Sequence, residues 1–135
     1  MQELQAEVDK SSDDASVLRA LRRYKQRQVL RIGGNDILRN RPLEEVTLDI
    51  SQVAEAALEV AMNFARKTLE RRYGIPFNAS DLPASCCILA FGKLGGEELN
   101  YSSDIDLMFV YDDDGFTKIS RGTPIDNSEF FSRLA

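Results

Sequence analysis

Apolar residues recur with a helical period in the middle and at the end of the chain. Across Leu48–Tyr73 they return every three or four positions, which predicts a long amphipathic helix packed against a sheet. Gly74 followed by Pro76 is expected to end it. A further helix, starting at Asp126 or Asn127 as its N-cap, is predicted from the phenylalanine and leucine spacing that follows.

The first forty residues have a different pattern. Residues 1–14 are polar and acidic with few large apolar groups, so we expect them to be disordered. A helix is predicted over Ala15–Arg31, which contains neither glycine nor proline and has Asp13 or Asp14 available as a cap. Gly33-Gly34 is expected to end this helix.

The segments around the two shorter apolar runs predict the sheet. Ser85–Phe91 is a continuous apolar run and is interpreted as a buried strand, and Asp104–Tyr111 is interpreted as a second strand. A short helical piece over Glu97–Tyr101 would connect them, and residues 75–84 are expected to form a loop. Helices and strands in this order predict an α+β (α/β-like) fold with a mixed sheet, preceded by a helical region.

Composition narrows the chemistry. The 135 residues carry a net charge of −5, which argues against general nucleic-acid binding, although residues 19–41 hold eight Arg or Lys against the single acid Asp36. That basic stretch is either a solvated helix face or a surface that steers an acidic partner. Histidine is absent, which excludes histidine-based catalysis. Cys86 and Cys87 are interpreted as core residues in a reducing cytoplasm. No signal peptide or membrane span is predicted.

Two carboxylates stand directly after a glycine turn. Gly95-Gly96 follows the first apolar strand, and such a turn can expose backbone N–H groups to a phosphate. Asp104 and Asp106 are two positions apart, so in a strand they project from one face while Ile105 and Leu107 enter the core. Paired carboxylates repel unless a cation lies between them. The pattern predicts a divalent metal bridging nucleotide phosphates, as in nucleotidyl transfer.

The same residues carry a resemblance to a known family. Gly92–Leu107, which has the sequence GKLGGEELNYSSDIDL, closely resembles the glutamine synthetase adenylyltransferase/deadenylylase family, part of the DNA polymerase beta-like nucleotidyltransferase superfamily. The likeness extends to Arg22–Ile32, a basic helix ahead of the catalytic domain, and to Asp126–Leu134, the helix after the second strand. It covers residues 17–135.

The resemblance implies a role for each motif residue. Asp104 and Asp106 would be catalytic and would bind Mg²⁺. The backbone of the glycine pair and the hydroxyl of one of two serines would hold the nucleotide phosphates, and a lysine would either neutralise phosphate charge or simply be solvated. The phosphate-binding residues implied in this way are Gly95, Gly96, Ser102, Ser103 and Lys93.

Three positions resemble the deadenylylating half of the family enzyme more than the adenylylating half: Asn100, Ile105 and the helix start Asp126-Asn127. The expected reaction is therefore removal of AMP from a tyrosine of glutamine synthetase by phosphorolysis to ADP. The resemblance implies glutamine synthetase, ATP or ADP, and phosphate as partners, and PII signalling protein through the full-length enzyme. Neither nucleic acid nor membrane is expected, and the location would be cytoplasmic.

The predicted organisation is a disordered segment over residues 1–14, a basic helical segment over 15–41 and an incomplete nucleotidyltransferase domain over 42–135. The family pattern has a third carboxylate on a strand beyond Ala135, so the isolated chain is expected to be inactive. Three alternatives stay open. They are the adenylylating domain of the same enzyme, another nucleotidyltransferase of the superfamily, and a non-catalytic regulatory or binding module.

Overall fold

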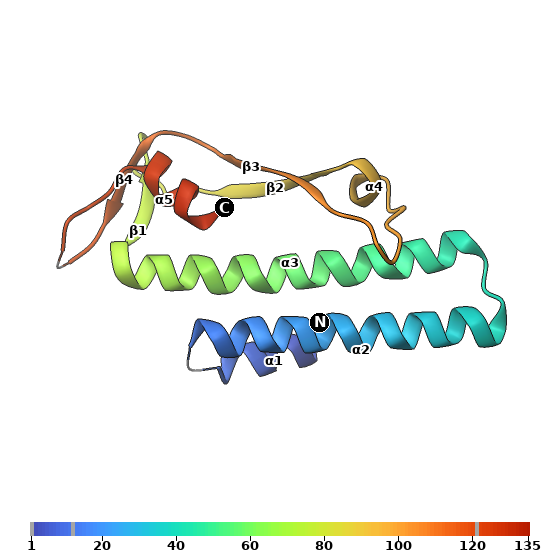
Figure 1. Cartoon of the computed structure of the whole chain (residues 1–135). Coiled ribbons are helices and arrows are strands. Elements are labelled where there is room, and N and C mark those ends of the chain that lie inside the picture. The colour runs from blue at the N-terminus through green and yellow to red at the C-terminus, as the bar shows by residue number, and fades with distance from the viewer. Residues whose placement is uncertain (1, 12, 121) are drawn as a thin grey trace. The chain divides into compact units, whose positions relative to one another are not determined.

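The computed structural model describes residues 2–11, 13–120 and 122–135. Over these residues helices combine with two small sheets, which confirms the predicted α+β class (Figure 1). One sheet pairs β1 with β4 and the other pairs β2 with β3. The elements are α1 (Gln2–Asp9), α2 (Asp14–Arg39), α3 (Leu43–Tyr73), β1 (Ile75–Asn78), β2 (Cys86–Phe91), α4 (Gly92–Gly95), β3 (Asp106–Tyr111), β4 (Gly115–Lys118) and α5 (Asn127–Leu134).

The chain divides into two compact units. The first unit contains residues 1–61 and 90–106, and the second contains residues 62–89 and 107–135. α3 is one continuous helix that contributes residues to both units. Within the described residues, no helix is both long and apolar enough to cross a membrane.

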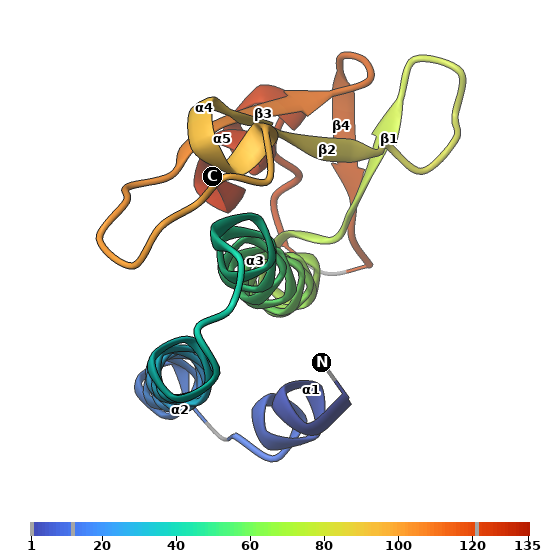
Figure 2. The same ribbon diagram turned by 90° about the vertical axis from the view of Figure 1, so that its right-hand side faces the viewer.

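The N-terminal residues of the first unit are folded, so the prediction of disorder over residues 1–14 is wrong for the described residues. Leu4 and Val8, one helical turn apart, are 1% and 2% exposed where α1 packs on α2 (Figure 2). Two ion pairs join the same helices, with Arg23 to Glu7 at 2.5 Å and Arg27 to Glu3 at 2.9 Å. α1 is therefore held on α2 both by its two buried apolar side chains and by ion pairs with the arginines of α2.

Helix α2 does not end at its glycines. It begins at a capping box in which Asp13 and Ser16 bond each other's backbone, continues through Gly33-Gly34 and ends at Asn40, whose φ of 48° is left-handed. A glycine in a helix costs about 1 kcal/mol relative to alanine, which is not enough to break a helix held by tertiary contacts. One such contact is the ring of Tyr101, which lies over Gly33.

Helix α3 begins five residues earlier than predicted and ends where predicted. Gly74 has a φ of +89° and its N–H bonds the Glu70 carbonyl at 2.9 Å. A Cβ on Gly74 would lie 2.3 Å from the Lys118 carbonyl oxygen, so only glycine fits there. Ile50 and Val53 of the predicted stripe are buried along α3, and so are Val46, which precedes the predicted helix, and Val60, which was not part of the stripe.

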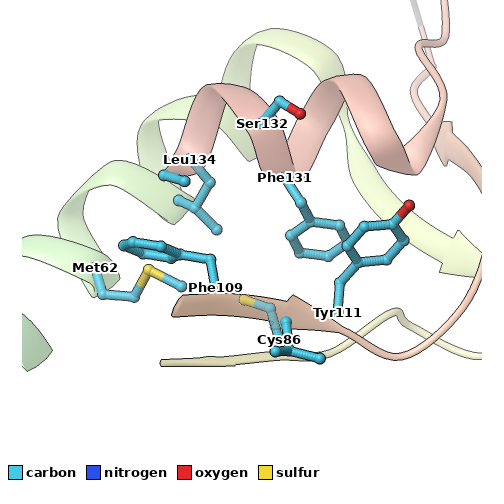
Figure 3. A pocket seen from close by; sticks show the side chains of 9 residues that line it. Met62, Cys86, Phe109, Tyr111, Phe131, Ser132 and Leu134 are labelled. Carbon is cyan, nitrogen blue, oxygen red and sulfur yellow. The ribbon is translucent and has the colours of Figure 1, made fainter. Parts of the chain in front are cut away.

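The second unit has an aromatic core built on α5. This helix is capped by Asp126 as predicted, since the Asp126 carboxylate accepts the Glu129 N–H at 2.7 Å. Phe130 and Phe131 are 0% and 5% exposed, and Phe131 stacks on Tyr111 with ring centroids 4.9 Å apart (Figure 3). The α5 helix therefore closes one face of this unit.

Two strands were not predicted from the sequence. β1 lies inside the expected loop 75–84, and β4 follows the polar turn after β3; the two pair antiparallel with Phe77 opposite Phe116. The fully buried Asn127 holds them from α5, because its side-chain amide donates to the carbonyls of Phe77 (3.1 Å) and Asp113 (2.9 Å). No described group donates to its own amide oxygen.

The β2 strand forms as predicted but is not buried on both faces. Leu89 of β2 is 46% exposed. On β3, which pairs with β2, alternate side chains are exposed as well, with Met108 at 51% and Val110 at 40%. Cys86 is half-buried and the neighbouring Cys87 is exposed; both are free thiols. The continuous apolar run therefore marks a strand whose second face is uncovered in this chain, and Cys87 is not a core residue.

Candidate functional site

The glycine turn after β2 is itself a helical turn. Residues Gly92–Gly95 form α4, so the short helix predicted over Glu97–Tyr101 is wrong in position. Gly92 has a φ of +57°, and a Cβ on Gly95 would lie 2.4 Å from the Ala90 carbonyl oxygen. The backbone folds back tightly enough that both positions require glycine.

Gly96 does not share this requirement. Its φ is −91°, and a Cβ placed on it would make ordinary contacts at 3.6 Å and beyond. Its N–H already bonds the Gly92 carbonyl at 3.1 Å, and the Glu97 N–H bonds the Leu94 carbonyl at 3.0 Å. Glu97 then adopts a left-handed φ of 57°. The predicted use of the Gly96 N–H for phosphate would have to share that hydrogen with the turn.

Asp106 lies against this turn. Its carboxylate oxygen Oδ2 would be 3.0 Å from a Cβ on Gly92, so the absence of a side chain there leaves room for the carboxylate. Asp104 is two residues earlier, exposed and outside β3, which begins at Asp106. Ile105 is 39% exposed, so the expectation that it enters the core is wrong. The exposed Lys93 lies within α4.

The segment between α4 and the carboxylates is anchored to both long helices. The buried Leu99 N–H donates to the hydroxyl of Ser51 on α3 (3.1 Å), and that hydroxyl donates to the Thr47 carbonyl (2.9 Å). The Tyr101 hydroxyl donates to Asp36 of α2 at 3.1 Å. Desolvation and this bond raise the pKa of Tyr101. These contacts fix where the chain enters Asp104.

Ser102 and Ser103 differ in how free their hydroxyl groups are to bind a phosphate. Ser103 is tied into its own turn, because its hydroxyl donates to the Asn100 side chain at 2.5 Å and its N–H donates to the Asn100 carbonyl at 3.3 Å. Ser102 is exposed. A phosphate would therefore find the Ser102 hydroxyl more readily than that of Ser103.

A cavity that the sequence did not reveal opens beside Asp104. Its volume is about 420 Å³, and it is walled by aliphatic side chains of α2 and α3 and by the segment from Leu99 to Ile105. Arg22 and Lys25 of α2 also line it. The small side chains Ala54, Ala57 and Ala61 on one stripe of α3 leave the space, and that spacing is the one signal in the sequence.

The second unit contains a smaller cavity of about 140 Å³ between α5 and β3 (Figure 3). Most of its lining is apolar. The polar groups are the Cys86 thiol, whose pKa is raised by burial, the Tyr111 hydroxyl and Ser132, which points away from the space. This cavity holds no arrangement of groups for chemistry.

Asp104 and Asp106 could serve as two protein ligands of a metal whose other ligands are water and phosphate oxygens. Among the described residues no group of three or more His, Cys, Asp or Glu side chains is placed to bind an ion. Magnesium commonly takes one or two protein carboxylates, keeps several waters and completes its shell with substrate phosphates. Asp104 and Asp106, both exposed, fit that donor set.

Comparison with known proteins identifies the family. The sequence profile of glutamate-ammonia ligase adenylyltransferase matches residues 1–135. The chain is 38% identical over 129 residues to a protein of Thioalkalivibrio sulfidiphilus, covering 96% of this chain and 13% of that protein. It is 42% identical over 115 residues to one of Shewanella frigidimarina, covering 85% and 12%. With one of Pseudomonas aeruginosa it shares 38% over 133 residues, covering 98% and 13%.

Each of these relatives is named bifunctional glutamine synthetase adenylyltransferase/adenylyl-removing enzyme. The chain thus spans about one eighth of the length of the curated relatives that it matches. The likeness first carried by Gly92–Leu107 is confirmed, and the chain belongs to the glutamate-ammonia ligase adenylyltransferase family.

Proposed function

We propose that this chain supplies the glycine turn and the first two carboxylates of a nucleotidyltransferase domain that removes AMP from a tyrosine of glutamine synthetase. The proposal rests on one observation: the Asp106 carboxylate lies against Gly92 of the glycine turn, and Asp104 is two residues before Asp106 in the chain. The names of the relatives combine adenylyltransferase and adenylyl-removing activities, which supports nucleotidyl transfer involving glutamine synthetase but does not distinguish the two directions.

The proposed reaction is a phosphorolysis. An oxygen of inorganic phosphate attacks the phosphorus of the AMP–tyrosine ester, a new phosphorus–oxygen bond gives ADP, and the bond to the tyrosine oxygen breaks. The tyrosine oxygen then takes up a proton. Bound Mg²⁺ would neutralise the phosphate oxygens and hold them in line for this displacement. Asp104 and Asp106 are the carboxylates proposed to hold it.

The cavity beside Asp104 suits the nucleoside of the substrate. Pockets that bind small molecules have volumes of about 300–1,000 Å³ and mainly apolar walls with a few polar groups, and this cavity of about 420 Å³ lies at the lower end. Ser103 and Asn100 offer polar atoms at its edge. The Tyr101–Asp36 bond and the Leu99–Ser51 bond keep this wall in place.

The choice of the deadenylylating half rests on Asn100, Ile105 and the Asp126-Asn127 helix start. Two of these residues, Asn100 and Asn127, form hydrogen bonds that hold local structure in this chain. Asn100 orients Ser103 in the turn before the carboxylates, and Asn127 ties α5 to two carbonyls of the second unit. The adenylylating half is the competing assignment, and the two are separated by measuring both activities.

The test uses a full-length family enzyme that carries this segment. Asp106→Asn and Asp104→Asn are compared with Glu98→Gln, an exposed acid of the same segment. ADP release from adenylylated glutamine synthetase, phosphate and Mg²⁺ should fall by on the order of 1,000-fold for the aspartate variants, a loss of several kcal/mol of transition-state stabilisation. It should be unchanged for Glu98→Gln, and ATP-dependent adenylylation should persist in all three.

The opposite pattern, with adenylylation lost and ADP release retained, would assign the chain to the adenylylating half. Wild-type values for both activities in the aspartate variants would refute the site itself. We further expect the 135-residue chain alone to release no ADP, because the family resemblance implies a third carboxylate besides Asp104 and Asp106.

A further inference from the structure

One face of α2 carries large apolar side chains in solvent. Leu30 is 76% exposed, Ile37 is 83% exposed and Leu38 is 85% exposed. Gly34 lies between them, and a Cβ on it would meet no atom within 4 Å. Spacings of three and four residues place the four positions on one stripe of the helix. This stripe, Leu30, Gly34, Ile37 and Leu38, is called the open stripe below.

The open stripe continues a face that α1 already covers. α1 pairs Glu7 with Arg23 and Glu3 with Arg27, so residue numbers fall along α1 as they rise along α2, and the two helices are antiparallel. Figure 1 shows α1 beside the first part of α2 only, with the later part extending past it. Counting on from Arg27 by three or four residues leads directly to the open stripe.

The charge pattern also continues. Arg23, Arg27 and Arg31 are spaced four residues apart, and the first two face acids that are themselves four residues apart. Arg31 donates to the neutral amide of Gln28 at 2.8 Å, and among the described residues it has no acidic partner. Arg31 is thus the third arginine of this series, and it lies beside the open stripe without an acidic residue opposite it among those described.

We propose that the open stripe is the docking site for an acidic amphipathic helix that runs antiparallel to α2 in line with α1. The occupant is a helix of the family polypeptide outside these residues. The relatives have ample polypeptide from which it could come, because the match covers only 13% of their length. Its apolar residues cover Leu30 and Leu38, its closest approach is over Gly34, and an acid faces Arg31.

A second copy of the same chain is a poorer occupant. Two open stripes packed together would bring Arg31 of both copies, which has no acidic partner among the described residues, into one interface, and like charges repel. An acidic helix removes that repulsion and repeats the pairing that α1 makes. This proposal does not depend on which reaction the family site performs.

The first test measures binding to the 135-residue chain. The probe is a fluorescein-labelled helical peptide of about 18 residues, with leucine at three/four spacing and glutamate on both flanks. It should bind, and Leu38→Asp should weaken binding at least about tenfold, a factor that corresponds to about 1.4 kcal/mol. Leu18→Asp is the matched control, since Leu18 is 52% exposed on another face of α2. A peptide with lysine in place of glutamate on both flanks should bind the wild-type chain as weakly as the glutamate-flanked peptide binds the Leu38→Asp variant.

Equal binding of the two peptides, or equal binding to wild type and Leu38→Asp, would overturn the proposal. Because Leu38 is exposed, its substitution should leave the fold unchanged, which circular dichroism checks directly.

The second test asks which segment occupies the stripe in a complete protein. Benzoylphenylalanine is placed at the position of the Pseudomonas aeruginosa relative that aligns with Leu38, and the protein is irradiated. The expected product is an intramolecular cross-link to an acidic helical peptide outside the matched 133 residues. A cross-link between two copies, or the absence of any cross-link, would refute the assignment.

Discussion

Replacing Ser51 by alanine tests whether the segment leading to the carboxylates is held by α3. Ser51 is fully buried, its hydroxyl donates to the Thr47 carbonyl and it accepts the N–H of Leu99 at 3.1 Å. Leu99 is itself 5% exposed, so water cannot easily replace the lost acceptor. The substitution therefore removes one hydroxyl and leaves one buried N–H without a partner.

The magnitude follows from two opposing effects. A buried N–H left unpaired costs about 1–3 kcal/mol. Alanine in a helix interior gains about 0.5 kcal/mol over serine. The loss of the bond to Thr47 carries little cost, because that carbonyl lies within α3. The free energy of unfolding should fall by about 0.5–2.5 kcal/mol, which corresponds to a decrease in Tm of about 2–9 °C for a chain of this size.

Two measurements are needed, one global and one local. Urea denaturation gives the change in unfolding free energy, and amide hydrogen exchange gives the protection of the Leu99 N–H. Gln52→Ala, an exposed neighbour on the same helix, is the control and should change neither. If Leu99 exchanges at the wild-type rate in Ser51→Ala, the anchoring of this segment by Ser51 is refuted, whatever happens to Tm.

Two further predictions concern single positions. Gly95→Ala should destabilise the fold because a Cβ there lies 2.4 Å from the Ala90 carbonyl oxygen, whereas Gly96→Ala should leave the urea midpoint within error; equal midpoints for both would contradict the geometry of the turn. Asn127→Asp replaces a donor that bonds two carbonyls with an acceptor and should cost about 2–5 kcal/mol at pH 7. Burial should raise the pKa of the introduced carboxyl, so the deficit should be smallest below about pH 4 and should grow as pH rises, and a pH-independent deficit would contradict this account.

Elements with local signals were predicted well. The end of α3 follows from Gly74, and the start of α5 follows from the Asp126 cap, because both signals act within one helical turn. β1 and β4 could not be found in the same way. Each has four residues, and Ile75 pairs with Lys118, so the strands exist through a partner far away in the sequence.

The N-terminal errors have a tertiary cause. The segment containing Leu4 and Val8 has too few apolar residues to predict a helix by itself, and it is α2 that supplies the surface and the arginines. Gly33 was expected to end a helix for reasons of propensity, but the Tyr101 ring lies over it. In both cases contacts between elements outweighed a local preference.

The glycines of the site show most clearly what a sequence pattern leaves undetermined. The adjacent pair Gly95-Gly96 draws attention in the sequence, yet only Gly95 of that pair meets a backbone oxygen at short range. Gly92, which has a left-handed φ of +57°, is the residue that lies against the Asp106 carboxylate. A side chain at Gly92 would both strain the backbone and crowd that carboxylate. The geometric link between the turn and the proposed metal ligand is therefore the spacing from Gly92 to Gly95, because one glycine admits the carboxylate and the other lets the chain return over Ala90.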